Sequence, residues 1–118
     1  MELSREIIDG VTIFTFGSRL TDANIAHIAE AVDAQIHLGA VRLVFNLSQV
    51  EFIHPAAFEY LMFTHERLPT LAGELVLSEP SSYVRKLLHD ALQVQFVCSA
   101  SDAGAVEYLG DPHRHRRD

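Results

Sequence analysis

Two short apolar segments near the start of the chain have the composition of β-strands. Residues 6–8 and 11–16 are rich in β-branched and aromatic side chains, which are enriched in strands. Asp9 and Gly10 separate the two segments, and this dipeptide favours the tight two-residue turn of a hairpin. The pattern therefore predicts an N-terminal β-hairpin.

Further along the chain, apolar residues repeat at spacings of three and four, the period of an amphipathic helix. Thr21 or Asp22 can cap the start of the first such segment, and Gly39 suits the position after its end. Pro55 suits the first turn of the second segment, and Gly73 follows its end. The predicted apolar stripes are Ile25, Ile28, Ala29, Val32 and Ile36 in the first helix, and Phe58, Leu61, Met62, His65 and Leu68 in the second.

Three further segments are predicted to be strands. Residues 41–47 are almost continuously apolar, as in strands that are covered on both faces in the middle of a parallel sheet. Residues 74–77 and 94–97 are shorter apolar segments. A helical pattern follows each of these two, with inward positions Val84, Leu87, Leu88 and Ala91 after residues 79–82, and Ala103, Val106 and Leu109 within residues 99–109.

The predicted order of elements is ββαβαβαβα. Strands that alternate with helices form right-handed crossovers and a mostly parallel sheet, so the predicted fold class is α/β with an N-terminal hairpin. The chain has 118 residues, which is the length of one domain. We expect a single domain over residues 1–110 and a polar, flexible tail over residues 111–118.

The composition limits the partners that the chain can bind. Its 16 acidic and 9 basic residues give a formal net charge of −7, which argues against nucleic-acid binding, because that binding relies on basic residues. The single cysteine, Cys98, excludes an internal disulfide and fits a cytoplasmic protein. The start of the chain lacks the apolar segment of a secretory signal, and no apolar run approaches the roughly 18 residues that span a membrane.

The sequence shows no motif typical of an enzyme or a cofactor site. It has no glycine-rich phosphate loop, no nucleophile elbow and no pair of carboxylates at a suggestive spacing. The spacing of His113 and His115 in the charged tail supplies too few ligands for a closed metal site. We therefore expect a non-enzymatic protein without cofactor or metal, in which Cys98 is a small buried side chain and His65 a core histidine.

Residues 43–61, LVFNLSQVEFIHPAAFEYL, combine a buried strand, a polar break, a short apolar stretch and the start of a helix. This segment resembles the STAS domain, the fold of bacterial anti-sigma factor antagonists and of the cytosolic part of sulfate transporters. The family pattern is a strand ending Leu-Asp-Leu-Ser, followed by a Val-x-Phe-Ile-Asp-Ser-Ser-Gly-Leu run that opens a helix. Similar patterns at residues 17–20, 73–77 and 84–96 extend the resemblance over residues 5–109.

The resemblance also implies a form of regulation. In phosphorylated members of the family, a partner kinase that is also an anti-sigma factor modifies a serine of the Asp-Ser-Ser-Gly run, and the added charge breaks the complex. In this chain His54 stands at the aspartate, Pro55 at the first serine, Ala56 at the accepting serine and Ala57 at the glycine. Alanine has no hydroxyl, so we expect docking without phosphorylation at Ala56.

The resemblance thus implies a protein-interaction module, an anti-sigma factor antagonist-like regulator that docks onto a histidine-kinase-like anti-sigma factor. A homodimer is compatible with this interpretation. Two alternatives stay open: a scaffold subunit of a larger assembly, such as a stress-signalling or lipid-transport ABC complex, and a ligand-sensing STAS domain. The expected contact residues are Ser48, Glu51, His54, Pro55, Ala56, Ala57, Glu59 and Arg19.

His54 replaces an acidic helix cap of the family pattern. Imidazole is a poor N-cap, so the sequence predicts a role other than capping for this side chain. One hypothesis is a pH-sensitive or phosphate-accepting histidine at the docking surface. The other is sequence drift at a site freed from phosphorylation.

Overall fold

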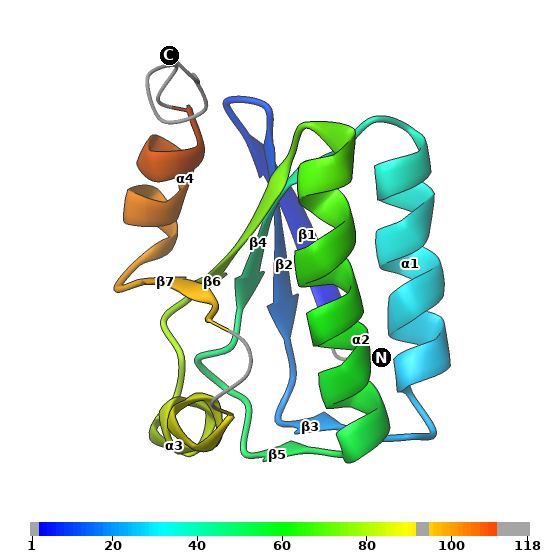
Figure 1. Cartoon of the computed structure of the whole chain (residues 1–118), viewed down its shortest axis with the longest axis vertical. Coiled ribbons are helices and arrows are strands. Elements are labelled where there is room, and N and C mark those ends of the chain that lie inside the picture. The colour runs from blue at the N-terminus through cyan, green and yellow to red at the C-terminus, as the bar shows by residue number, and fades with distance from the viewer. Residues whose placement is uncertain (1–2, 92–94, 111–118) are drawn as a thin grey trace.

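A five-stranded sheet forms the centre of the computed structural model, which describes residues 3–91 and 95–110 (Figure 1). β1 is antiparallel to β2, and the other neighbouring pairs of this sheet are parallel. In spatial order the strands are β1 (Leu3–Ile8), β2 (Val11–Phe16), β4 (Arg42–Asn46), β6 (Glu74–Ser78) and β7 (Val97–Ser99). The predicted fold class, α/β with a mostly parallel sheet and an N-terminal hairpin, is confirmed.

Helices cover the two faces of this sheet unequally. α1 and α2 lie side by side on one face, α4 lies on the other, and α3 lies near the carboxyl ends of the parallel strands (Figure 1). The helices are α1 (Ile25–His37), α2 (Pro55–Arg67), α3 (Ser82–Asp90) and α4 (Asp102–Gly110), and the 3₁₀ helix η1 (Leu68–Leu71) follows α2.

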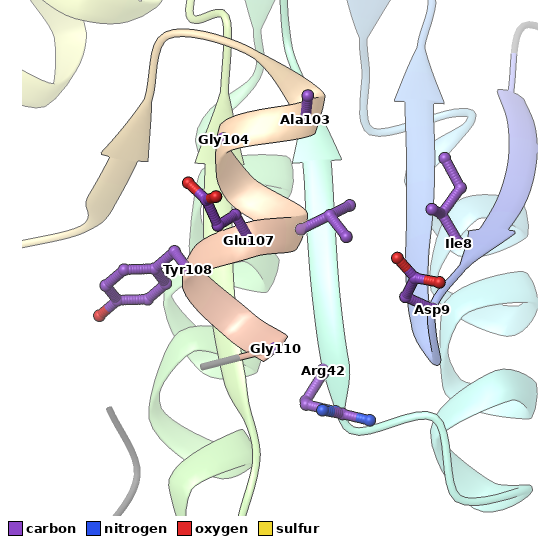
Figure 2. A pocket seen from close by; sticks show the side chains of 9 residues that line it. Ile8, Asp9, Arg42, Ala103, Gly104, Glu107, Tyr108 and Gly110 are labelled. Carbon is purple, nitrogen blue, oxygen red and sulfur yellow. The ribbon is translucent and has the colours of Figure 1, made fainter. Parts of the chain in front are cut away.

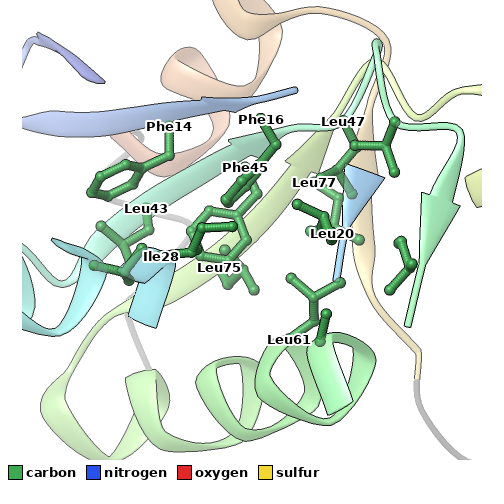
Figure 3. Close-up of a cluster of buried hydrophobic side chains, with 14 of the residues drawn as sticks. Phe14, Phe16, Leu20, Ile28, Leu43, Phe45, Leu47, Leu61, Leu75 and Leu77 are labelled. Carbon is green, nitrogen blue, oxygen red and sulfur yellow. The ribbon is translucent and has the colours of Figure 1, made fainter. Parts of the chain in front are cut away.

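Side chains of the central strands alternate between two apolar clusters, because successive residues of a strand point to opposite faces of the sheet. The cluster beneath α1 and α2 contains Phe14, Phe16, Leu43, Phe45, Leu75 and Leu77 (Figure 3). The cluster beneath α4 contains Val11, Ile13, Val44 and Val76. Since β4 contributes to both clusters, Leu43, Val44 and Phe45 are all completely buried, which explains the unbroken apolar run in this strand.

Two local predictions are confirmed by the backbone, and a third is corrected. Asp9 and Gly10 have φ values of 51° and 79°, as the type I′ turn of a two-residue hairpin requires. Gly39 follows α1 with a φ of 100°, a conformation that glycine adopts without steric cost. The predicted cap at Thr21 or Asp22 is wrong, because the N-cap of α1 is Asn24, which makes no side-chain cap hydrogen bond. The hydroxyl of Thr21 accepts a hydrogen bond from the Asn24 amide at 3.0 Å, within the turn that leads into α1.

The sequence pattern misses two strands and misplaces two later elements. β3 (Arg19–Leu20) and β5 (Phe52–Ile53) pair in parallel as a separate small sheet, and strands of this length are too short to show an alternating pattern. The last strand is β7 rather than residues 94–97, of which residue 94 lies outside the described residues. α4 begins at Asp102, later than the predicted residue 99.

These shifts change the burial of residues near the C-terminal end. Ala105, Val106 and Leu109 of α4 are buried, whereas Ala103, which the pattern placed inward, is exposed. Cys98 is also exposed rather than buried, because it lies on β7, an edge strand of the sheet. The prediction of a buried thiol is therefore wrong.

The buried stripe of α2 is rotated relative to the predicted one. The buried positions along α2 and its 3₁₀ extension are Ala57, Leu61, Thr64 and Leu68. Phe58, Met62 and His65 are only half-buried. The rings of Phe58 and His65 both lie against the ring of Phe96, with centroids 6.2 Å and 4.8 Å away, so His65 lies at the margin of the core.

Candidate docking surface

The connections that follow β2, β4 and β6 gather at one end of the molecule. Because these strands are parallel, their carboxyl ends lie at the same edge of the sheet, where ligand- and partner-binding loops of α/β proteins commonly cluster. β3, β5, α3 and the start of α2 all lie at this end (Figure 1). We call the exposed or half-exposed side chains here the docking surface: Arg19, Ser48, Glu51, Phe52, His54, Pro55, Ala56, Glu59 and Tyr83.

The pair formed by β3 and β5 provides the base of this surface. Leu20 and Ile53 lie opposite each other and are almost fully buried, which anchors both strands to the core. On the outer side, the Arg19 guanidinium lies over the ring of Phe52, 4.7 Å from its centroid. This cation–π contact fixes the exposed Arg19 side chain against the surface.

Tyr83 of α3 completes the base and was not predicted from the sequence. Its hydroxyl oxygen accepts a hydrogen bond from the Ile53 amide at 3.1 Å, although the residue as a whole is 37% exposed. An exposed tyrosine that is also bonded to the backbone offers rigid apolar area, as protein interfaces favour. The sequence signal that could have identified Tyr83 was its position in the first turn of a predicted helix at the carboxyl edge of the sheet.

His54 is the N-cap of α2, which corrects the prediction made for it. Its Nδ1 atom accepts a hydrogen bond from the Ala56 amide at 3.0 Å. Unprotonated imidazole nitrogen is a hydrogen-bond acceptor, so it can replace the oxygen of the usual capping residues. Pro55 follows at the first helical position, as predicted.

The predicted contact residues differ in their accessibility. Arg19, Ser48, Glu51, Pro55 and Glu59 are exposed, and His54 and Ala56 are half-buried. Ala57 is completely buried on the inner side of α2, so it cannot touch a partner while the helix is folded. The structure therefore brings seven of the eight predicted residues to accessible positions.

A polar network centred on Asn46 holds the loop after β4. The Asn46 amide nitrogen donates to Asp102 Oδ1 at 3.0 Å and to Glu79 Oε2 at 3.3 Å. Its amide oxygen accepts hydrogen bonds from the backbone N–H and the hydroxyl of Ser48. The Ser78 hydroxyl also donates to Asp102. Sequence analysis missed Asp102, because no local pattern shows that α4 starts beside the end of β4.

Ser81 ties the same loop to α3. Its hydroxyl oxygen accepts a hydrogen bond from the Val84 amide as the N-cap of α3. The same hydroxyl donates to the carbonyl oxygen of Val50 at 2.6 Å, and Val50 is completely buried. The loop is therefore anchored by both α3 and β4, which makes the docking surface a pre-organised one.

An open groove of about 1080 Å³ lies away from this surface, between α4 and the turn of the β1–β2 hairpin (Figure 2). It shares no residue with the docking surface. Its lining combines apolar and charged side chains without a grouping that indicates a reaction: Ile8, Asp9, Arg42, Val106, Glu107 and Tyr108, together with small residues of α4.

Two further searches concern the residues that the structure describes. Within residues 3–91 and 95–110, no three His, Cys, Asp or Glu side chains are grouped as a metal site requires. The pair His113 and His115 lies outside this part of the chain. In the same described residues, no helix is both long enough and apolar enough to cross a membrane.

The arrangement of a mixed sheet, a small second sheet and a capped helix at its edge agrees with a family comparison. A profile of the STAS domain matches residues 2–97. The chain belongs to the STAS domain family. The resemblance inferred from residues 43–61 is thereby confirmed.

Known relatives of this STAS domain share most of their length with it. BtrV of Bordetella bronchiseptica, named as a candidate anti-sigma factor antagonist, is 26% identical over 110 residues, covering 92% of this chain and 95% of BtrV. A Thermotoga maritima protein named in the same way has a TM-score of 0.84 at 19% identity, covering 92% of this chain and 95% of its own. Unphosphorylated SpoIIAA from Bacillus, an anti-sigma factor antagonist, has a TM-score of 0.79 at 17% identity, covering 91% and 95%. These structures show a shared fold.

Proposed function

We propose that this STAS domain is an anti-sigma factor antagonist-like regulator that acts in the cytosol by binding a histidine-kinase-like anti-sigma factor. It acts by docking and carries out no reaction of its own. Relatives that match over nearly their whole length are named for this role. Their names support the proposal, and the docking surface supplies a structural basis for it.

The docking surface has the properties of a protein-binding site. Its loops are held by the Asn46 network and by Ser81, so little conformational freedom is lost on binding. Its exposed side chains include Glu51 and Glu59, and the chain carries a formal net charge of −7. An acidic surface of this kind steers the domain toward a basic partner surface.

One observation carries the proposal of docking without phosphorylation. The first turn of α2 contains Pro55, Ala56 and Ala57 after the His54 cap, and none of these side chains has a hydroxyl. A phosphoryl group at such a helix start would add strong negative charge to the docking surface. Without an acceptor at Ala56, ATP and the kinase cannot end the complex through this position.

The test uses the purified chain and each histidine-kinase-like anti-sigma factor of its source organism. Calorimetric titration is expected to detect a complex with one of them, and prolonged incubation with ATP is expected to leave the intact mass of the chain unchanged. A gain of one phosphoryl group, for example at Ser18, Thr21 or Ser48, would overturn the unphosphorylated mechanism. Failure of every candidate kinase to bind would overturn the proposed function.

A charge-reversal pair locates the interface. Glu51 lies on the docking surface, whereas Glu107 lies on α4 at the groove, and both are exposed. Glu51→Lys is expected to weaken binding at least about fivefold, because charge complementarity at an interface is lost. Glu107→Lys makes the same change in net charge and is expected to leave the affinity unchanged. Equal effects of both variants would exclude this surface as the interface.

A further inference from the structure

The cap formed by His54 determines where its imidazole carries a proton. Nδ1 accepts the hydrogen bond of the Ala56 amide, and a nitrogen that accepts a hydrogen bond cannot itself be protonated. His54 is therefore held as the neutral tautomer whose proton is on Nε2.

The Nε2 atom of His54 is at least partly accessible, because the side chain is half-buried and Nε2 is not among the buried side-chain atoms that lack a partner. Among residues 3–91 and 95–110, the side-chain hydrogen bond of His54 is the one that Nδ1 accepts from Ala56, which leaves Nε2–H for a partner. The backbone around it is fixed: the His54 amide donates to the Leu20 carbonyl at 2.8 Å. The docking surface thus presents one N–H donor in a defined position.

We propose that His54 is a specificity-determining residue of the docking surface, and that its partner places a hydrogen-bond acceptor oxygen, from a carboxylate or a carbonyl, opposite Nε2–H. This inference rests on the proposed function, because it describes the chemistry of the partner at the same surface. A partner with a donor at that point would leave two N–H groups facing each other without an acceptor, which disfavours binding.

The same tautomer argues against His54 as a phosphoryl acceptor. The attacking nitrogen needs a free lone pair to form a bond to phosphorus. The lone pair of Nδ1 is directed at the Ala56 amide, and Nε2 carries the proton. Phosphorylation would require loss of the helix cap. His54 therefore cannot act both as the hydrogen-bond donor proposed here and as a phosphoryl acceptor.

Asparagine and aspartate form a matched pair of variants for the test. Both are good N-caps, so α2 keeps its first turn in each. His54→Asn retains an N–H group on the outer side of the cap, whereas His54→Asp places a carboxylate oxygen there. We expect His54→Asn to bind the anti-sigma factor within about threefold of the wild type and His54→Asp to bind at least about tenfold more weakly. Equal affinities of the two variants would overturn the inference.

A second measurement does not depend on any partner. The ¹⁵N NMR spectrum of the imidazole rings in the full chain at neutral pH is expected to show His54 with a protonated Nε2 and an unprotonated Nδ1. A mixture of tautomers, or a proton on Nδ1, would overturn the assignment even if docking is confirmed. If the wild type binds no candidate anti-sigma factor, the proposed function fails, and with it the inference that a partner places an acceptor oxygen opposite His54. The spectrum still decides the tautomer in that case.

Discussion

Asn46 donates a side-chain N–H to the carboxylate of Asp102 across 3.0 Å, although the two residues are 56 positions apart in the chain. Asn46 ends β4, and Asp102 begins α4 on the sheet face opposite α1 and α2. Through its amide oxygen Asn46 also holds Ser48 of the docking surface. One almost fully buried amide therefore connects that surface to a helix on the other side of the sheet.

Asn46→Asp is expected to destabilise the fold. The change replaces an N–H donor with a carboxylate beside Asp102 and Glu79, so that like charges meet at a buried site and two acceptors lose their donor. We expect a loss of about 2–4 kcal/mol in the free energy of unfolding, measured by urea denaturation. Adding Asp102→Asn should restore part of the loss, because it removes one of the repelling charges. Identical midpoints for wild type and Asn46→Asp would contradict this account.

Tyr83→Phe is expected to loosen β5 without unfolding the domain. The substitution removes the oxygen that accepts the Ile53 amide, at an expected cost of about 1 kcal/mol. Hydrogen exchange at the Ile53 amide should become faster. Tyr108→Phe is the matched control, because it removes a hydroxyl that donates to Glu74. Unchanged exchange at Ile53 in Tyr83→Phe would show that the tyrosine does not hold this strand.

Gly73→Ala tests the close approach between the residues that immediately precede β4 and β6, Val41 and Gly73. A Cβ atom at Gly73 would lie 2.0 Å from the carbonyl oxygen of Val41, so the backbone would have to move. We expect a loss of about 3 kcal/mol in the free energy of unfolding, seen as a lower urea midpoint. Gly110→Ala meets no atom within 4 Å and should change stability by less than about 0.5 kcal/mol. A Gly73→Ala variant as stable as the wild type would be inconsistent with this packing.

Cys98 is expected to react slowly despite its exposure. Partial burial of the sulfur raises the pKa of the thiol, and this effect outweighs the opposing influence of Arg85. The thiolate is the reactive form, so a raised pKa leaves less thiolate at neutral pH. The rate of alkylation should therefore keep increasing as the pH rises. Alkylation by iodoacetamide at pH 7 should therefore be slower in the folded chain than in urea. A faster reaction in the folded chain would contradict the direction of this shift.

Elements with strong local signals were predictable from the sequence. The Asp9-Gly10 turn, the apolar run of β4 and the proline at the start of α2 each depend on interactions within a few residues. The gathering of the docking-surface loops at one end of the molecule also followed, because parallel strands bring their carboxyl ends to one edge. Accordingly Ser48, Glu51 and Pro55 lie where they were expected. Ala57 did not, since the exact face of α2 depends on how the helix rotates against the sheet.

The α/β class and the order of the main elements could be read from the chain, because they follow from composition and short-range periodicity. The lack of a hydroxyl at Ala56 is a matter of residue identity, and its meaning came from the resemblance to the STAS pattern. Three findings required the folded chain: Tyr83 and Asp102 support the docking surface, Cys98 is exposed on an edge strand, and His54 caps α2. Each of these depends on contacts between distant segments or on the direction of one side chain. Neither leaves a periodic signal along the chain.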